Sequence, residues 1–174
     1  MNSGSKGTGS KGTGSKGTGA EYLVRKSDLA KSRKDMPSYK DILIVEDENL
    51  DANRLVATLR TMFGYELQVR RAKTLSSAVD MVLSRPPELV LLDDMLKPSD
   101  RATDSIPMIR RANYTGPIVI ISSMIDRERR KLLIARGATD TIHKDDLNSV
   151  AIAEVLTRLG SGPFVASAST TDCP

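Results

Sequence analysis

Acidic, hydroxyl and amine side chains stand directly after short apolar runs at four places in this chain. They are Glu46 and Asp47 after residues 42–45, Asp93 after residues 89–92, Ser122 after residues 118–121, and Lys144 after a shorter and weaker run at residues 139–143. Carboxylate oxygens are the ligands that magnesium prefers, and hydroxyl and ammonium groups donate hydrogen bonds to phosphoryl oxygens. These residue types predict a site that binds magnesium and receives a phosphoryl group.

The apolar runs are expected to be strands of one sheet that brings these side chains together. Segments with apolar residues at three-and-four spacing separate the runs and predict helices. The expected helices are residues 50–63, 75–82, 106–111, 126–136 and 147–159, and residues 67–71 make a weak edge strand. This alternation indicates an α/β fold with a doubly wound, five-stranded parallel sheet and helices on both faces. The functional crevice of such a sheet lies at the carboxyl ends of its strands.

Local signals predict how several of these elements begin. Pro107 is expected in the first turn of its helix, where a missing N–H group costs nothing. Asp145 or Asp146 is expected to cap the last helix through its side chain. A loop that contains Lys97 and Pro98 is expected to follow the strand of the central aspartate.

Composition divides the chain into four parts. Residues 1–19 contain three identical copies of Ser-Lys-Gly-Thr-Gly and are expected to be a flexible linker. The exact repetition indicates that this linker is engineered. Residues 20–40 are interpreted as a basic linker or a short helix, and residues 41–160 as the folded domain. Residues 161–174 are small and polar, and they predict a loose tail.

Composition also excludes several classes of protein. No apolar run approaches the roughly 20 residues of a membrane span, and the N-terminus lacks the apolar centre of a signal peptide. Cys173 is the only cysteine, so an internal disulfide is excluded and a reducing, cytoplasmic setting is expected. Residues 1–39 hold eight Lys and Arg against three Asp and Glu, so any nucleic-acid binding would have to use that segment.

The residues around the four polar positions resemble the receiver domains of bacterial response regulators. The matching stretches are residues 41–48 with the opening acidic pair, 89–98 with the phosphoacceptor aspartate and a Met-Leu-Pro-like turn, 118–123 with the hydroxyl of the fourth strand, and 137–144 with the Gly-Ala-x-Asp stretch before a lysine. The resemblance covers residues 41–159 and implies the flavodoxin-like receiver fold.

The resemblance implies a role for each matching residue. Asp93 would accept a phosphoryl group from a histidine kinase, a phosphotransfer protein or a small phosphodonor. Ser122 would donate a hydrogen bond to the attached phosphoryl group, and Lys144 would pair with its charge. The Mg²⁺ ligands would be Glu46 through water, Asp47, Asp93 and the carbonyl oxygen of Met95.

The chain departs from the family pattern at several positions. Glu46 replaces the commoner aspartate, and Lys97 is an additional residue in the turn after the acceptor strand. Asp145 stands where the family has a proline in a cis bond, which leaves the geometry of that peptide bond open. Thr141 stands where the family has the Tyr or Phe that moves inward on phosphorylation, so signalling is expected to use movements of residues 122–130 instead.

The leading interpretation is a receiver that signals through contacts with an unknown downstream protein. It would be a freestanding regulator, a phosphorelay shuttle or a domain cut from a hybrid kinase, and a phosphorylation-dependent homodimer stays open. The basic residues Arg127, Arg129, Arg130 and Lys131 would set partner choice or simply form a solvated face.

There are two alternatives to this interpretation. One is a receiver-like interaction module that works without phosphorylation. The other is a phosphatase with an aspartate nucleophile, which is disfavoured because Met95 stands where that chemistry needs a second aspartate. Turnover of an external substrate is therefore not expected.

Overall fold

The structure is a computed structural model that describes Met1 and residues 37–160. The predictions made for residues 2–36 and 161–174 lie outside the described residues. Among the described helices, none combines the length and the hydropathy that crossing a bilayer requires.

Five strands form one parallel sheet, as the alternating pattern predicts, and their order is β2-β1-β3-β6-β7. The strands are β1 (Asp41–Val45), β2 (Gln68–Ala72), β3 (Leu89–Asp93), β6 (Ile118–Ser122) and β7 (Asp140–His143). The chain passes from β1 to β2 on one side and then to β3 on the other. The switch point of the sheet therefore lies between β1 and β3, and folds of this kind bind their ligands at the carboxyl ends of the strands there.

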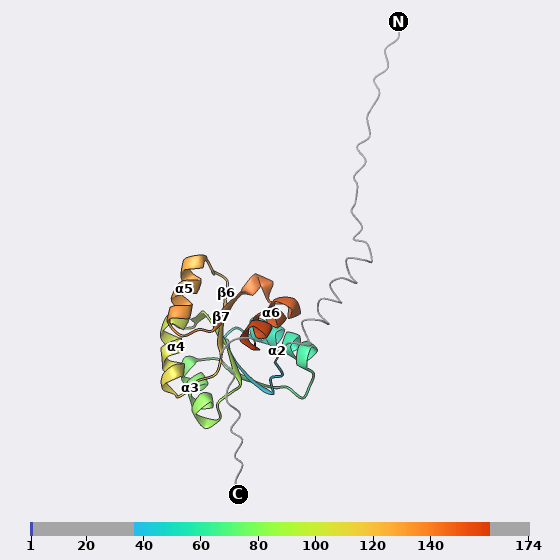
Figure 1. Cartoon of the computed structure of the whole chain (residues 1–174). Helices are drawn as coiled ribbons and strands as arrows, with labels where there is room; N and C mark the ends of the chain where they lie inside the picture. Colours follow the sequence, from blue (N-terminus) through green and yellow to red (C-terminus); the bar gives the residue numbers. More distant parts are fainter. Residues whose placement is uncertain (2–36, 161–174) are drawn as a thin grey trace.

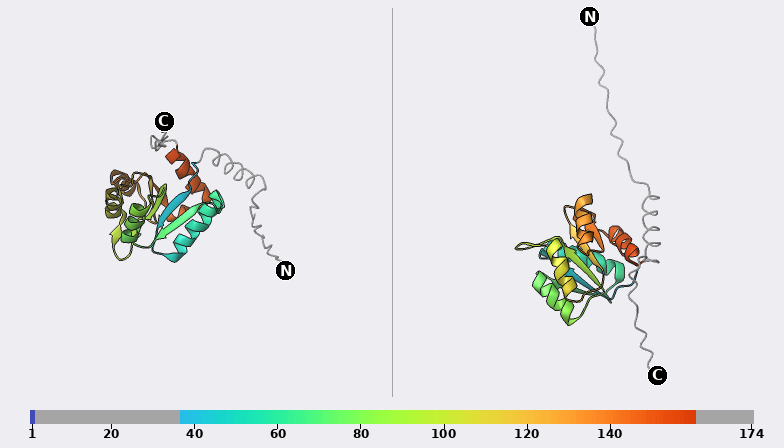
Figure 2. Two further views of the ribbon diagram at one scale, coloured as in Figure 1. Left: turned by 90° about the horizontal axis from the view of Figure 1, so that it is seen from below. Right: turned by 60° about the vertical axis from the view of Figure 1, so that its left-hand side comes forward.

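Five described helices cover both faces of this sheet. They are α2 (Asn49–Phe63), α3 (Leu75–Ser84), α4 (Ala102–Arg111), α5 (Arg127–Ala135) and α6 (Ser149–Gly160). Helices α2 and α6 pack on one face, and α3, α4 and α5 pack on the other (Figures 1 and 2). This is the doubly wound, three-layer arrangement that the sequence predicts.

Alternating side chains of the central strands build two separate cores. In β1, Leu43 and Val45 join the core under α3, α4 and α5, whereas Ile42 and Ile44 join the core under α2 and α6. Both faces of a central strand are buried, so its sequence is continuously apolar rather than alternating. β2 lies at the edge and carries polar residues, which explains its weak pattern in the sequence.

The start of α4 differs from the prediction. The helix begins at Ala102, four residues before the expected start, so Pro107 lies in its interior rather than in its first turn. Ala102 and Ile106 are fully buried, and the N–H group of Ala102 donates to the carbonyl of Asp94 at 2.9 Å. Tertiary burial therefore fixes this helix start despite the backbone hydrogen bond that a proline removes.

The cap of α6 also differs from the prediction. Asp145 and Asp146 belong to a short 3-10 turn, η1 (Lys144–Asp146), and the helix starts after it. The side chain of Asn148 accepts hydrogen bonds from the N–H groups of residues 150 and 151, at 2.9 and 3.0 Å. Asparagine is as good a helix cap as aspartate. Because the helix starts later than expected, Asn148 caps it in place of Asp145 or Asp146.

The segment after β3 is a short hairpin rather than the expected open loop. β4 (Met95–Leu96) pairs antiparallel with β5 (Asp100–Arg101), and Lys97 lies in the turn between them. The Lys97–Pro98 bond is the only cis peptide bond among residues 37–160, so the bond after Lys144 is trans.

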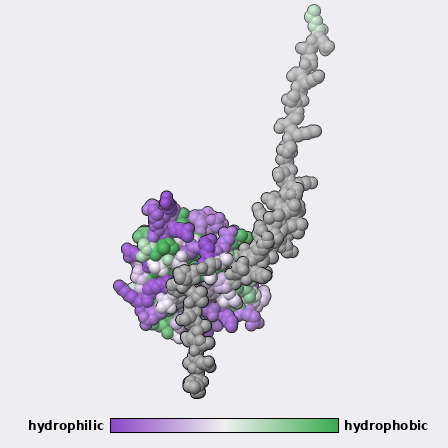
Figure 3. Space-filling view, in the orientation of Figure 1, coloured by the Kyte–Doolittle hydropathy of each residue, from purple (hydrophilic) through white to green (hydrophobic). Residues whose placement is uncertain are grey.

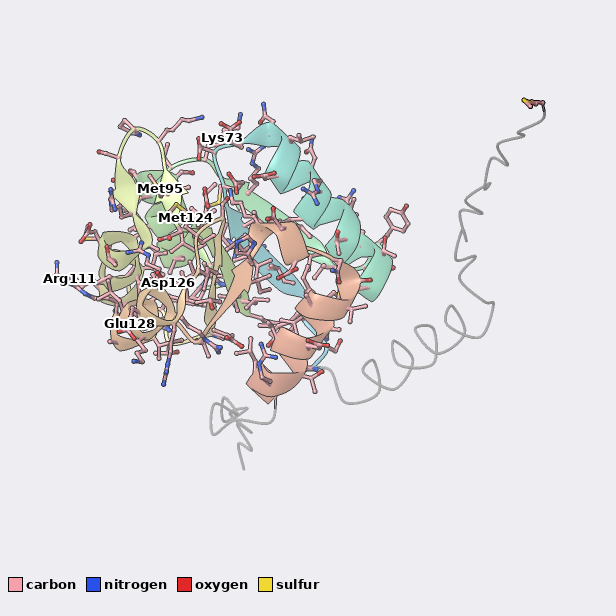
Figure 4. All side chains as sticks on the ribbon, turned by 90° about the horizontal axis from the view of Figure 1, so that it is seen from above. Lys73, Met95, Arg111, Met124, Asp126 and Glu128 are labelled. Atoms are coloured by element: carbon pink, nitrogen blue, oxygen red, sulfur yellow. The ribbon has the colours of Figure 1, made fainter. Side chains whose placement is uncertain are left out.

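Hydrophilic side chains dominate the described surface in Figure 3, and apolar side chains show there as small separate patches. The large apolar side chains that remain exposed include two methionines next to the carboxyl ends of the central strands. Met95 is 60% exposed and Met124 is 79% exposed, and Figure 4 shows both at that end of the sheet.

Candidate functional site

The carboxyl ends of β1 and β3 bring three carboxylates together at the switch point of the sheet. Strand pairing sets Val45 beside Leu92, so Glu46 and Asp47, which follow β1, lie next to Asp93 at the end of β3. One carboxylate oxygen from each of the three acids lies within 4.8 Å of the others. Glu46 is 1% exposed and Asp93 is 6% exposed. The acidic cluster is present as expected, and two of its carboxylates are shielded from water.

Lys144 lies inside this cluster and joins it to α2. Its Nζ atom is 3.1 Å from Asp93 Oδ1, 3.0 Å from Glu46 Oε2 and 3.0 Å from Asp51 Oδ2. The lysine directly follows β7, so the edge strand delivers it to the site. Sequence reasoning missed Asp51, although an acid in the first turn of the helix that follows the acidic pair was a usable signal.

The environment of Asp93 favours its protonated form. Burial has the largest effect, the charge of Glu46 adds to it, and together they raise the pKa of Asp93 to about 6. The ammonium of Lys144 and the N–H group of Met95 act in the opposite direction and lower this pKa. The carboxylate is therefore ionised at neutral pH, but it is poorly hydrated and more basic than an ordinary aspartate.

The environment of Lys144 favours its charged form. Burial alone would lower the pKa of this ammonium, but hydrogen bonds to Asp51 and Glu46 and the charge of Asp93 outweigh burial and raise the pKa. Lys144 is a fixed positive charge within the acidic cluster over the whole physiological pH range.

Arg71, on the edge strand β2, holds the backbone of the acidic loop. Its Nε and Nη2 atoms donate to the carbonyl of Glu46 at 3.0 and 2.9 Å, and Nη2 also donates to the carbonyl of Asp47 at 3.0 Å. Its Nη1 atom donates to the side chain of Asn49 at 2.8 Å. The planar guanidinium therefore holds the backbone at residues 46 and 47 and ties it to the first residue of α2. Nothing in the local sequence indicates this role.

Lys97 approaches the same loop from the solvent side. Its Nζ atom lies 3.6 Å from Asp47 Oδ2 and also hydrogen-bonds the carboxylate of Glu48. The side chain is 72% exposed. The additional residue in the turn thus supplies a second ammonium to the acidic cluster, on the hairpin that follows Asp93.

A family model described as the response regulator receiver domain matches residues 42–155. This chain belongs to the response regulator receiver family. The sheet order and the five covering helices are the flavodoxin-like receiver fold that the sequence predicts. The acidic cluster is typical of the Mg²⁺ site of these domains. Residues 42–155 are therefore a signalling domain of two-component systems.

Two curated relatives and one solved structure illustrate the similarity. The chain is 35% identical to the nitrogen assimilation regulatory protein NtrX of Azorhizobium caulinodans over 60% of this chain and 22% of that protein. It is 32% identical to the transcriptional regulatory protein RstA of Escherichia coli over 66% of this chain and 46% of that protein. The chain therefore spans less than half the length of either relative.

The solved structure is the BeF3-activated N-terminal receiver domain of RstA from Klebsiella pneumoniae. It is 28% identical to this chain and superposes with a TM-score of 0.58. The match covers 68% of this chain and 97% of that one. The similarity is thus to a receiver domain along nearly its whole length.

The receiver hydroxyl at Ser122 lies at the predicted strand end but is bonded to a residue that sequence reasoning missed. Its Oγ atom donates to Oδ2 of Asp94 at 3.0 Å and accepts a hydrogen bond from the N–H group of Met124 at 3.1 Å. Asp94 directly follows Asp93 and is 5% exposed. Two adjacent aspartates after an apolar strand were visible in the sequence, but their different partners were not.

Three of the four basic residues of the receiver helix α5 form ion pairs with carboxylates of the domain. Arg129 pairs with Asp94, Arg130 Nη2 lies 2.7 Å from Asp140 Oδ1, and Lys131 Nζ lies 2.8 Å from Glu128 Oε1. Within residues 37–160, Arg127 is the one of the four without an ion pair. Arg129 and Arg130 therefore help to fix the helix in place. Thr141, at the position of the family's aromatic switch, is half-buried on β7.

Proposed function

We propose that this chain is a phosphoacceptor receiver in which Asp93 takes a phosphoryl group from a histidine kinase or a histidine phosphotransfer protein. One observation carries the proposal. Asp93 is a buried carboxylate at the end of a central strand, 3.1 Å from the ammonium of Lys144 and within 4.8 Å of the carboxylates of Glu46 and Asp47. A nucleophile, a fixed positive charge and two metal-binding acids thus share one site.

In the proposed transfer, a carboxylate oxygen of Asp93 attacks the phosphorus atom of a phosphohistidine. The P–N bond breaks, the histidine nitrogen keeps the electron pair, and an acyl phosphate forms on the aspartate. Positioning and charge stabilisation are the main contributions that a protein makes to phosphoryl transfer. Lys144, fixed by Glu46 and Asp51, would hold the phosphoryl oxygens against the aspartate. Ser122 would donate a hydrogen bond to the transferred group.

The residues present fit a magnesium ion. The carboxylates of Glu46, Asp47 and Asp93 offer hard oxygen ligands close together, and Mg²⁺ prefers such ligands while keeping several waters. The carbonyl oxygen of Met95 would be a further ligand, with Glu46 acting through water. The ion would offset the repulsion between the acids and the incoming phosphoryl oxygens.

The output of the proposed receiver is a contact with another protein. We place this signalling in the cytoplasm, with a phosphohistidine protein upstream and an unknown protein downstream. A homodimer that depends on phosphorylation is one form that the output would take. Asp-nucleophile phosphatase chemistry has no support, because Met95 stands two residues after Asp93 where that chemistry needs an acid.

Phosphorylation with a small donor tests the proposal. The protein is incubated with Mg²⁺ and acetyl phosphate, and intact masses are recorded for the parent, Asp93→Asn and Asp94→Asn. We expect one added phosphoryl group on the parent and on Asp94→Asn, and none on Asp93→Asn. Addition to Asp93→Asn but not to Asp94→Asn would mean that Asp94, and not Asp93, accepts the phosphoryl group. If the parent gains nothing here or from a panel of phosphorylated kinases, the interaction module without phosphorylation becomes the better description.

Replacement of Arg71 by methionine is expected to weaken Mg²⁺ binding by about 10-fold, the low end of the loss when an outer-shell partner of a metal ligand is removed. The physical reason is that Arg71 fixes the backbone of Glu46 and Asp47 without contacting the metal position. Mg²⁺ affinity is measured by isothermal titration calorimetry.

Arg70→Met is the matched control for this variant. It removes the same charge from the adjacent position of β2, but Arg70 pairs with Asp41 at the opposite end of β1. An equal loss of Mg²⁺ affinity in both variants would mean that general charge, not the loop contact, is responsible.

A further inference from the structure

We propose that Asp94 is a latch residue that withholds the Ser122 hydroxyl from the phosphoacceptor site and ties α5 to the resting position of that hydroxyl. The inference rests on the proposed function of Asp93 and names the residues by which phosphorylation would reach α5. It also supplies a switch that needs no aromatic side chain at Thr141. The latch is defined here as Asp94, Ser122 and Arg129.

The latch residues come from three elements that meet beside the acceptor. Ser122 Oγ donates to Asp94 Oδ2 at 3.0 Å, and Arg129 Nε donates to the same oxygen at 3.2 Å. Arg129 Nη2 donates to the other carboxylate oxygen, Oδ1. One carboxylate thus joins the end of β6 to the first turn of α5 through a two-pronged guanidinium contact.

The backbone around Asp94 gives this carboxylate a fixed position. Its N–H group donates to the carbonyl of Ile121 at 2.9 Å, and its carbonyl accepts from the N–H group of Ala102 at 2.9 Å. The residue is 5% exposed, so water replaces its partners poorly. The side chain of Arg129 is mostly shielded as well, at 21% exposure. Separating a charge pair that is shielded in this way is costly, because it leaves an uncompensated charge.

The two states of the latch exclude one another because a serine hydroxyl has a single proton to donate. In the resting state that proton goes to Asp94. When Ser122 donates it to a phosphoryl group on Asp93, Asp94 keeps only Arg129. In the resting state the Met124 N–H group donates to Ser122 Oγ at 3.1 Å. When Ser122 Oγ rotates toward the phosphoryl group, this N–H group loses its acceptor.

Phosphorylation would therefore loosen residues 123–126, which join β6 to α5. Asp126 caps that helix by accepting from the N–H group of Arg129, so the cap and the latch act on the same turn. Figure 4 marks this part of the molecule at Met124, Asp126 and Glu128. The start of α5 is the surface whose change a downstream partner would detect.

Beryllofluoride, which forms a phosphoryl-like complex on an aspartate, tests the latch without covalent chemistry. We measure its affinity with Mg²⁺ by ¹⁹F NMR for the parent, Asp94→Asn and Arg129→Met. Asp94→Asn is expected to bind about 10-fold more tightly, because Ser122 no longer has to leave a charged acceptor. Arg129→Met is expected to bind more weakly than the parent, because Asp94 then relies on Ser122 alone.

A double-mutant cycle separates the latch from a general effect of charge. In the Ser122→Ala background, Asp94→Asn is expected to change beryllofluoride affinity by less than about twofold, since the competing hydroxyl is gone. Arg127→Met removes the same charge as Arg129→Met from an exposed position two residues earlier in α5 and is expected to behave like the parent. A tenfold effect of Asp94→Asn that persists without the Ser122 hydroxyl would overturn the latch.

Hydrogen exchange gives a readout that does not depend on affinity. Beryllofluoride is expected to speed amide exchange of residues 123–130 in the parent, and Asp94→Asn is expected to show that speed without beryllofluoride. Equal affinities and equal exchange in parent and Asp94→Asn would overturn the latch while leaving the acceptor role of Asp93 intact. A parent that neither binds beryllofluoride nor gains a phosphoryl group would overturn both proposals.

Discussion

Lys144→Met is expected to lower the free energy of unfolding in the absence of Mg²⁺ by about 3–5 kcal/mol, the usual effect of removing one partner of a buried ion pair. Lys144 stands 3.1 Å or less from carboxylate oxygens of Asp93, Glu46 and Asp51. Without it, the carboxylates of Glu46 and Asp93 would face each other, nearly fully buried, with no cation between them. Urea unfolding in EDTA measures the loss.

Mg²⁺ is expected to restore part of the stability that Lys144→Met loses, because a bound cation supplies positive charge to the same carboxylates. Lys97→Met is the control: this lysine meets Asp47 and Glu48 of the same cluster, but its side chain is 72% exposed. Exposed pairs contribute little, so that variant is expected to unfold like the parent. If the free energy of unfolding falls equally in the two variants, the cluster is well solvated and burial does not strengthen the ion pairs of Lys144.

The fold and the acidic cluster at the strand ends were predictable because the relevant information is local. A buried parallel strand needs a continuous apolar run, and a catalytic or metal-binding side chain at its end interrupts that run visibly. β3 is fully buried from Leu89 to Asp93, and its aspartate is the charged residue in an otherwise apolar stretch. The helix expected at residues 126–136 was predictable for the same reason, and the structure has α5 at Arg127–Ala135.

The residues that position these groups were not predictable, because their partners lie far away in the sequence. Lys144 meets Asp51 across 93 positions, Arg71 meets the carbonyl of Glu46 across 25, and Arg129 meets Asp94 across 35. Lys144 was singled out because it follows a strand, but Asp51, Arg71 and Asp94 look like ordinary charged residues until the sheet order is known. The early start of α4 has a similar cause, since burial of Ala102 outweighs the local signal from Pro107.

Asp93→Asn is expected to raise the free energy of unfolding in EDTA at pH 8 by about 3 kcal/mol, at 1.36 kcal/mol for each unit of pKa. Burial and the charge of Glu46 raise the pKa of Asp93 from 3.8 to about 6, so the ionised carboxylate destabilises the folded protein. Between these values the folded state holds the proton more tightly than the unfolded state. The free energy of unfolding of the parent therefore falls as pH rises through this window, and the full penalty is present above pH 6.

Asparagine carries no charge, so the advantage of Asp93→Asn is expected to vanish as the pH falls from about 6 to about 4. Urea unfolding of both proteins across this range measures the difference. Asp80→Asn removes an exposed carboxylate of α3 and is expected to track the parent at every pH. A constant difference in free energy of unfolding between Asp93→Asn and the parent would mean that the acceptor carboxylate is solvated.

The proton that relieves the penalty also blocks nucleophilic attack, so phosphorylation is expected to slow over the same pH window. Burial thus has two effects at neutral pH: it lowers the stability of the domain, and it keeps the Asp93 carboxylate basic, poorly hydrated and therefore reactive.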